Sequence, residues 1–261
     1  VINRMGQVEE GTTTSDYDPE ETKRHISVQL SVLPFEWKGA KVNLIDTPGY
    51  ADFIGEVREA VRVVDAAIIV IDAVSGVEVG TETMWRYANE FNLARILCVS
   101  KMDRENAEFE RTVDQLRDRF GSKVVPIQVP IGSQTNFQGV VDLITMTAYT
   151  GAKGAAGQPP AANQREKMVE SIAETDDELI NKYLEGEQIT DDELKAALRK
   201  GTLSGQLIPV VCTAADGNIG VQPLMDTIVD YLPSPADVGP ITATDPVANT
   251  EVEVTPSASE P

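Results

Sequence analysis

The sequence predicts an α/β fold in which a mostly parallel sheet carries helices on both faces. Between residues 41 and 129, short apolar runs typical of buried strands alternate with amphipathic stretches typical of helices. A last apolar run and a last amphipathic stretch follow at residues 206–231. Strands that alternate with helices form parallel sheets, because each helix carries the chain back to the edge where the previous strand began. From Gly139 the pattern changes, and residues 139–200 form a different, largely helical region.

The first two expected strands form an antiparallel hairpin. Residues 26–33 alternate between apolar and polar side chains, which predicts a strand with one solvated face. Residues 37–39 make a turn into a second run, in which Val42, Leu44 and Ile45 suit a strand covered on both faces.

The remaining elements follow in chain order. Strands are expected at residues 66–73, 95–100, 124–129 and 206–212, and helices at residues 82–91, 105–120, 166–184, 191–200 and 220–231. A further helix is expected to begin near Asp52, and Thr190 is expected to cap the helix that follows it. Residues 11–19 are rich in turn formers, and residues 151–162 in Gly, Ala and Pro, so both are expected to be loops. Residues 233–261 are rich in Pro, Ser and Thr, which predicts a partly disordered linker.

The chain is strongly acidic, with a formal net charge of −20 over 261 residues. Proteins that grip nucleic-acid phosphates concentrate Lys and Arg, so we expect no DNA partner. An acidic surface suits basic protein partners. Cys98 and Cys212 lie in apolar runs without a Cys-x-x-Cys spacing, which predicts buried, reduced thiols in a cytoplasmic protein. Since no apolar run is long enough to cross a bilayer, we expect no membrane partner.

A single carboxylate stands where the strand at residues 41–45 ends. Asp46 is followed by Thr47, Pro48 and Gly49, which break the chain sharply. At the carboxyl end of a strand in an open α/β sheet, a carboxylate can hold Mg²⁺ directly or through water. Gly49 has no side chain, so its N–H can approach a phosphate oxygen closely. On these residues alone, an incidental Asp before a Pro-Gly turn is an equally good interpretation.

A second short motif, Ser100-Lys101-Met102-Asp103, directly follows the strand expected at residues 95–100. Guanine offers two adjacent donors, its ring N–H and its amino group, and one carboxylate can accept from both, whereas adenine offers no such pair. The methylene stem of the neighbouring Lys can cover the face of the base. The motif alone is weak evidence for a guanine site, but its place at a strand end, downstream of Asp46, makes that evidence stronger.

Together these motifs resemble those of the translational GTPases, and of the elongation factor G family in particular. Asp46-Thr47-Pro48-Gly49 is similar to the D-T-P-G element of that family, and Ser100-Lys101-Met102-Asp103 is similar to its N-K-x-D element. Residues 209–215 resemble the later loop that touches the guanine edge, and residues 23–27 resemble the switch loop that ends in R-G-I-T. Residues 139–144 and 169–187 resemble the insert that separates this family from its elongation-factor-Tu-like relatives. The resemblance runs from about residue 6 to about residue 235.

The resemblance implies a P-loop GTPase-type fold with a small inserted α+β subdomain, which hydrolyses GTP on the ribosome to drive translocation. The implied cofactors are GTP or GDP and Mg²⁺, and the implied partners are ribosomal RNA and the ribosomal stalk protein. The implied site residues are Gly49 and Tyr50 for catalysis, Asp46 and Ser27 for the metal, and Ser100, Lys101, Asp103, Thr213, Ala214 and Ala215 for the nucleotide. The implied organisation is a GTP-binding domain in residues 1–129 and 206–235, an inserted subdomain in residues 130–205 and a linker in residues 236–261.

Four departures from the family pattern qualify these implications. The phosphate-binding loop G-x-x-x-x-G-K-[ST] is absent from the sequence. In the family this loop precedes the residue that matches Val1, so we expect a fragment that is inactive alone. Ser27 replaces the Thr that binds Mg²⁺, and Ser100 replaces the Asn of N-K-x-D. Tyr50 replaces the His that positions the attacking water, although its hydroxyl can still hydrogen-bond a water. These changes indicate a divergent paralogue rather than the housekeeping protein.

Two other functions stay open. Tyr50 and Ser100 are compatible with a nucleotide-binding switch, or a ribosome-associated regulator, that hydrolyses little GTP. The absent phosphate-binding loop is compatible with a chain that acts only as a protein-interaction piece. The sequence does not contain the later domains that would separate elongation from ribosome recycling or ribosome protection.

Overall fold

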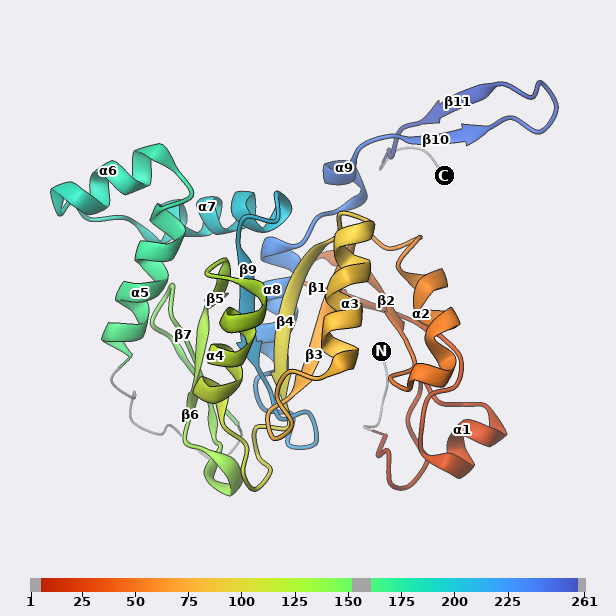
Figure 1. Ribbon diagram of the computed structural model, residues 1–261, viewed down its shortest axis with the longest axis horizontal. Coiled ribbons are helices and arrows are strands. Elements are labelled where there is room, and N and C mark those ends of the chain that lie inside the picture. Colours follow the sequence, from red (N-terminus) through yellow and green to blue (C-terminus); the bar gives the residue numbers. More distant parts are fainter. Residues whose placement is uncertain (1–5, 152–160, 258–261) are drawn as a thin grey trace.

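The computed structural model describes residues 6–151 and 161–257, and a four-stranded parallel sheet lies at its centre (Figure 1). The strand order is β3-β4-β9-β5, with β3 at Ala66–Asp72, β4 at Ala94–Ser100, β9 at Ile208–Cys212 and β5 at Val124–Pro126. All of its pairings are parallel. Because parallel strands need a crossover, α3 (Val79–Glu90) joins β3 to its neighbour β4, and α4 (Phe109–Phe120) joins β4 to β5, which lies beyond β9. The predicted α/β fold is confirmed.

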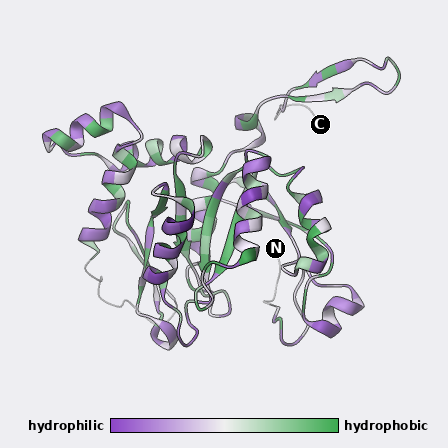
Figure 2. Ribbon diagram, viewed as in Figure 1, coloured by the Kyte–Doolittle hydropathy of each residue, from purple (hydrophilic) through white to green (hydrophobic). Residues whose placement is uncertain are grey.

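The hydrophobic core follows the middle strands of this sheet. β9 is buried along its whole length and β4 along all but its last residue, as expected for inner strands of a parallel sheet. Figure 2 shows hydrophobic residues along these strands and many hydrophilic residues on the surrounding helices. The predicted buried thiols are confirmed, since Cys98 and Cys212 are both free and buried. Burial raises the pKa of Cys98 to about 11.

Helices cover both faces of the sheet. In Figure 1, α3 and α4 lie in front of it, and α8 (Val221–Tyr231) lies behind it. Trp85 of α3 stacks on Phe120 of α4, with 4.0 Å between the ring centroids. The buried Arg95 of β4 lies over the same Trp85 ring, 4.7 Å from its centroid, so the cation is stabilised where water is scarce.

The predicted antiparallel hairpin is confirmed. β1 (Ser31–Trp37) pairs with β2 (Ala40–Asp46), and Lys38 and Gly39 turn between them with positive φ angles. The expectation that Val42, Leu44 and Ile45 are covered on both faces is wrong. These side chains are partly exposed, Leu44 to 37%, because β2 pairs with β1 alone among the described residues.

Side chains attach this hairpin to the rest of the molecule. The Trp37 ring N–H donates to Asp226 of α8 at 2.7 Å. Lys38 Nζ lies 3.0 Å from the Asp226 carboxylate and 3.8 Å from that of Asp230. Although burial opposes it, these two carboxylates raise the pKa of Lys38. The turn end of the hairpin is therefore held against α8, which fixes the direction in which β2 runs toward Asp46.

The first strand begins later than predicted. The run at residues 26–33 becomes a strand only from Ser31, because side chains take the backbone N–H groups before it. Glu21 accepts from Val28 and Gln29 at 2.9 and 3.0 Å, so these groups are not available to a strand ladder. A short helix that the pattern does not predict, α1 (Pro19–Arg24), holds Glu21 in this position.

The strand expected at residues 124–129 is divided between two sheets. β6 (Gln128–Ile131), β7 (Gly139–Asp142) and β8 (Ala148–Thr150) form an antiparallel sheet of their own, while β5 belongs to the central sheet. Ile127 stands at the junction, where its N–H donates to the Val210 carbonyl and its carbonyl accepts from Leu143. One apolar run thus serves both sheets, which hydrophobicity alone cannot reveal.

The helical region contains three helices in the described residues. They are α5 (Ala162–Ala173), α6 (Asp177–Glu185) and α7 (Asp191–Leu203). The single helix expected at residues 166–184 is wrong, because the Asp176 carboxylate accepts from backbone N–H groups and starts a new helix. The cap expected at Thr190 is confirmed, and Glu193 completes its capping box. The loop expected at residues 151–162 lies mostly outside the described residues.

Several helix bounds differ from the predicted ones. The helix expected near Asp52 begins as a 3-10 turn, η1 (Ala51–Phe53), and continues as the short α2 (Ile54–Ala60). α3 begins at Val79, before the expected residue 82. α4 begins at Phe109 rather than at residue 105. The N–H groups of Arg104 and Ala107 donate to the carbonyls of Lys101 and Arg104, so this stretch forms two successive reverse turns instead of a helix. None of the described helices is long and apolar enough to span a membrane.

Residues 233–257 contain more structure than is expected of the linker predicted at this end of the chain. α9 (Pro235–Val238) precedes an antiparallel hairpin of β10 (Ile241–Thr244) and β11 (Glu251–Val254). Arg199 of α7 pairs with Asp237 of α9 at 2.9 Å, which holds the start of this segment against the body. The hairpin itself projects away from the body in Figure 1.

Candidate functional site

Two loops at the carboxyl end of the central sheet carry the residues predicted to contact the base. Ser100, Lys101 and Asp103 stand at the end of β4, and Thr213 follows β9, its parallel neighbour. The Met102 N–H donates to the Thr213 carbonyl at 3.2 Å, and the Thr213 hydroxyl donates to Ser100 Oγ at 3.4 Å. The structure therefore brings together two segments that lie far apart in the sequence.

The loop after β4 leaves one carboxylate free. Lys101 has a left-handed backbone with a φ of 59°, and the Arg104 N–H donates back to its carbonyl at 3.1 Å. This turn buries Met102 and leaves Asp103 half-buried. Within the described residues, Asp103 has no hydrogen-bond or ion-pair partner. A ligand donor can thus bond the Asp103 carboxylate without displacing a protein group.

The loop after β9 is closed on itself. Ala214 and Ile219 exchange two backbone hydrogen bonds, at 2.9 and 3.0 Å. Gly220 ends the loop with a φ of 76°, and a Cβ there would lie 2.5 Å from the Cys212 carbonyl oxygen, so the position requires glycine. Ala214 is buried whereas Ala215 is exposed. Of these two predicted residues, Ala215 is therefore the one that a ligand can reach.

The predicted metal ligands, Asp46 and Ser27, both lie near a carboxylate, Asp16, that no motif marks. Asp16 accepts from the Ser27 hydroxyl at 2.7 Å and from the Thr13 hydroxyl at 2.9 Å, and it is 8% exposed. Burial raises the pKa of Asp46, opposed by a hydrogen bond from Ser15 and helped by the negative charge of Asp16. The hydroxyl and carboxylate oxygens of Ser27, Asp16 and Asp46 are the donors that Mg²⁺ prefers.

A second carboxylate outside the predicted site residues, Glu21, shapes the loop before β1. Glu21 is 2% exposed and completes a capping box with Asp18. Burial alone would raise the pKa of Glu21, but hydrogen bonds from backbone N–H groups, including those of Val28 and Gln29, hold this pKa below its usual value. The spacing D-x-x-E of a capping box was the available signal. The loop that carries Ser27 is thereby fixed by a charged side chain.

Gly49 and Tyr50 lie on an exposed turn after β2. Tyr50 is 57% exposed, and its carbonyl accepts from the Phe53 N–H at 3.0 Å, which opens η1. Open space surrounds the position that a Cβ on Gly49 would take. The phenol is available to water or a ligand. Among the described residues, no hydrogen bond or ion pair joins this turn to the loop at residues 100–103.

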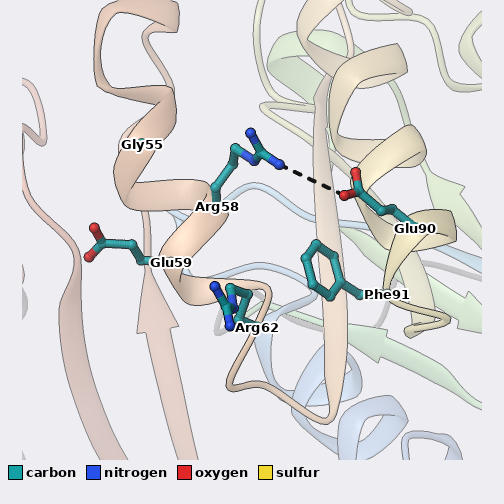
Figure 3. Close-up of a pocket in the computed structure, with 6 residues that line it drawn as sticks. All are labelled: Gly55, Arg58, Glu59, Arg62, Glu90 and Phe91. Atoms are coloured by element: carbon teal, nitrogen blue, oxygen red, sulfur yellow. Dashed lines mark ion pairs between the residues drawn. The ribbon is translucent and has the colours of Figure 1, made fainter.

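A cavity of about 590 Å³ lies between α2 and α3 (Figure 3). Its lining residues come from α2 and the residues just after it, and from the end of α3: Gly55, Arg58, Glu59, Arg62, Glu90 and Phe91. Arg58 reaches toward Glu90 with 3.8 Å between their charged atoms, and both side chains are largely exposed, so this pair contributes little stability. None of the predicted site residues lines this cavity, so we assign the candidate site to the strand ends.

The fold is of the open parallel α/β class, in which ligands, nucleotides among them, bind outside the carboxyl ends of the strands. The comparison with known families then gives the particular family. The chain belongs to the elongation factor Tu GTP binding domain family, whose model matches residues 1–234.

Individual relatives agree with this membership. The chain is 44% identical to elongation factor G of Thermotoga maritima and 45% identical to elongation factor G of Thermotoga neapolitana, in each case over 91% of this chain. It spans 36% of the length of these relatives. A crystal structure of a protein from Thermus thermophilus matches with a TM-score of 0.84 and 35% identity, covering 97% of this chain and 40% of that one.

Proposed function

We propose that this chain is the GTP-binding domain of an elongation-factor-G-like translation factor that hydrolyses GTP on the ribosome to drive translocation. The observation that carries the proposal is the unpaired Asp103 at the end of β4, beside the loop that begins at Thr213. The identity of 44% to elongation factor G of Thermotoga maritima supports the choice among GTP-binding proteins. Tyr50 and Ser100, which depart from the family motifs, support a divergent paralogue.

Each site residue receives a role in this proposal. The Asp103 carboxylate accepts from the two donors of guanine, and the Lys101 stem covers the base. Ser100, Thr213 and Ala215 complete the nucleotide contacts, and the buried Ala214 shapes the loop that presents Ala215. Gly49 offers its N–H to a phosphate oxygen, and Tyr50 orients the attacking water through its hydroxyl.

The residues on the metal side fit Mg²⁺. Asp46 and Ser27 offer a carboxylate and a hydroxyl oxygen, and the raised pKa of Asp46 reports a carboxylate that is partly buried beside a like charge. A divalent cation would relieve this repulsion. When bound, Mg²⁺ supplies charge neutralisation for the phosphates. Ser27 already donates to Asp16, and its oxygen lone pairs are still available to a cation.

The organisation and partners belong to the same proposal. Residues 1–129 and 206–235 form the GTP-binding domain, residues 130–205 form an inserted subdomain, and residues 236–261 are a linker. The full-length protein works in the cytoplasm with ribosomal RNA, and the insert contacts the ribosomal stalk protein. Since the sequence contains no G-x-x-x-x-G-K-[ST] loop, the 261-residue chain is a fragment without GTPase activity.

A second candidate function is a nucleotide-binding switch that hydrolyses little GTP. Tyr50 favours it, because a phenol positions water less strongly than an imidazole that can also carry charge. Multiple-turnover GTPase assays of the full-length gene product, with and without ribosomes, separate the two. Ribosome-stimulated phosphate release supports the enzyme, whereas nucleotide binding without stimulated release supports the switch.

The proposal is tested at the base site. Asp103→Asn in the full-length gene product should weaken GTP binding and favour xanthosine triphosphate, because the Asn amide offers a donor where xanthine carries a carbonyl. Both nucleotides are titrated against the wild-type and variant proteins in Mg²⁺. An unchanged preference between them would remove Asp103 from the base site. Asp114→Asn, which changes another acid in the same part of the chain, is the matched control and should leave the preference unaltered.

A further inference from the structure

A carboxylate that belongs to neither motif stands beside the proposed base site. Asp72 is the last residue of β3, and it is in register with Ser100 of β4. Because the two strands are parallel, Asp72 and Lys101 both lie at the carboxyl ends of the strands, on the same side of the sheet. Lys101 Nζ donates to Asp72 Oδ2 at 2.8 Å. The ion pair therefore bridges the ends of two neighbouring strands.

The turn after β3 holds the Asp72 carboxylate in place. Asp72 Oδ1 accepts from the N–H groups of Val74 and Ser75, at 2.8 and 3.3 Å. The Gly76 N–H donates to the Asp72 carbonyl at 2.8 Å, which closes the same turn. One carboxylate oxygen is thus occupied by the backbone, and the other is left for Lys101. Asp72 is a preorganised acceptor rather than a freely rotating surface side chain.

The pairing also decides which carboxylate stays free. Asp103 follows Lys101 by two residues in the same reverse turn, so it is the carboxylate nearest to Lys101 along the chain. In the structure, the Lys101 ammonium pairs with Asp72 instead, and Asp103 has no partner among the described residues. An ammonium bonded to Asp103 would compete with the two guanine donors for the same oxygens.

We propose that Asp72 is a positioning residue for guanine recognition. By holding the Lys101 ammonium, it places the lysine stem as a wall of the base site and keeps the Asp103 carboxylate available. The proposal rests on the proposed function above, because it needs a guanine nucleotide at this site. It adds to that function a residue that touches no base and acts through Lys101.

The test compares two nucleotides in the full-length gene product. GDP and inosine diphosphate are titrated in Mg²⁺ at low salt against wild type, Asp72→Asn, Lys101→Met and the double variant. Asp72→Asn removes the charge but retains an acceptor oxygen for Val74 and Ser75, so the turn is kept. Partly exposed ion pairs change an equilibrium by up to about fivefold. We expect Asp72→Asn to weaken GDP binding about two- to fivefold.

Inosine lacks the amino donor that guanine presents. The affinity for inosine diphosphate should therefore fall less than that for GDP when the Lys101 ammonium occupies the Asp103 carboxylate. We therefore expect Asp72→Asn to reduce the ratio of GDP affinity to inosine diphosphate affinity, and the loss to shrink at high salt. When Lys101 is already replaced by Met, adding Asp72→Asn should change neither the GDP affinity nor the inosine diphosphate affinity any further. Asp65→Asn, at the opposite end of β3, is the matched control and should alter neither affinity.

The outcomes separate this inference from the function on which it rests. Unchanged GDP affinity in Asp72→Asn, an equal loss for both nucleotides, or a loss that persists beside Lys101→Met would each overturn the positioning role. In all three cases the wild-type protein still binds GDP, and the proposed function survives. Failure of the wild-type protein to bind either nucleotide would overturn both proposals.

Discussion

Asp46 ends β2 and Asp103 lies in the loop after β4; both are half-buried, but their polar neighbours differ. Asp103 is unpaired among the described residues, whereas Asp46 is partly buried near Asp16, and burial raises the pKa of Asp46. A raised pKa favours folding below the usual Asp pKa of about 3.9, and this advantage is lost as the pH rises through the raised value. At neutral pH, the charge on Asp46 is therefore a cost of folding that a bound cation would offset.

Tyr50 is the residue whose replacement tests the hydrolytic part of the proposal. If its phenol stands where the family has a water-positioning His, Tyr50→His in the full-length gene product should raise ribosome-stimulated GTP hydrolysis. General acid–base groups raise the rate of a catalysed step by about 10²–10⁴-fold. We expect an increase at the low end of this range, because orienting the water without accepting its proton is a smaller effect. Initial rates of phosphate release with ribosomes measure the change.

Tyr17→His provides a control for this substitution, because Tyr17 is another exposed tyrosine on the loop before β1. It should leave the hydrolysis rate unaltered. Loss of activity in Tyr50→His would instead mean that the site is built around the phenol, and the role assigned to Tyr50 by resemblance would be wrong.

At the scale of elements, the central strands and the loops at their ends are predicted well. The apolar runs that become β3, β4 and β9 have the short length and apolar composition typical of strands in a parallel sheet, and their bounds shift by little. The adjacency of the loops at Ser100 and Thr213 follows from the parallel pairing of β4 with β9. The strands themselves need no knowledge of distant contacts, whereas the adjacency of the loops depends on a pairing of residues far apart in the sequence, such as Leu97 with Val210.

The elements that are predicted poorly are those decided by single polar side chains. Asp176 starts a new helix inside an otherwise helical pattern, and Glu21 delays β1 by taking two of its expected N–H groups. The roles of Asp16 and Asp72 depend on partners far away in the sequence. Hydrophobic periodicity carries no information about such hydrogen bonds, so only the three-dimensional arrangement reveals them.

The Glu21 contacts give a prediction for the loop that precedes β1. Glu21→Gln should speed amide hydrogen exchange at Val28 and Gln29 by about tenfold, because hydrogen bonds to a charged acceptor are worth about 1.5–3 kcal/mol and a neutral amide replaces it. Hydrogen exchange followed by NMR or mass spectrometry measures the change. Glu20→Gln is the matched control, because Glu20 is exposed and, within the described residues, its carboxylate pairs only with Arg24 of the same helix.

The same contacts set the direction of the pH dependence. The pKa of Glu21 is held below its usual value, so the stabilisation is present above the unfolded pKa of about 4.3 and is lost as the pH falls through the folded pKa. The difference between wild type and Glu21→Gln should therefore disappear on acidification below about pH 4. A difference that is constant across this range would show that the charge of Glu21 does not stabilise the loop.

At the scale of the whole molecule, the two sheets that carry the proposed site are separate. β2, which ends at Asp46, pairs with β1 alone, and β3 pairs with β4 alone, within the described part of the chain. β3 exposes Val70 to 64% although Ile69 and Ile71 beside it are buried. One edge and part of one face of this strand are thus uncovered. Burying a valine side chain fully is worth about 1.5–3 kcal/mol, so this surface is a source of instability.

The separation of the sheets leads to a prediction for the 261-residue chain by itself. It contains the proposed base carboxylate, Asp103, and the proposed metal-side carboxylate, Asp46, but no G-x-x-x-x-G-K-[ST] loop. The backbone N–H groups and Lys of such a loop provide much of the neutralisation of a bound polyphosphate. We therefore expect this chain to bind GTP more weakly than micromolar, to release no phosphate, and to unfold at a lower temperature than the full-length gene product.

The measurement is a titration of the purified chain with a fluorescent GTP analogue in Mg²⁺, together with phosphate release and a thermal unfolding scan. The matching ATP analogue controls for binding through the phosphates alone, because Asp103 should discriminate only between the bases. Micromolar binding with turnover would mean that residues other than those named here hold the phosphates. Since the carboxylates at Asp16, Glu21 and Asp46 repel a polyphosphate in the absence of a cation, any binding that does occur should require Mg²⁺ and disappear when the metal is chelated.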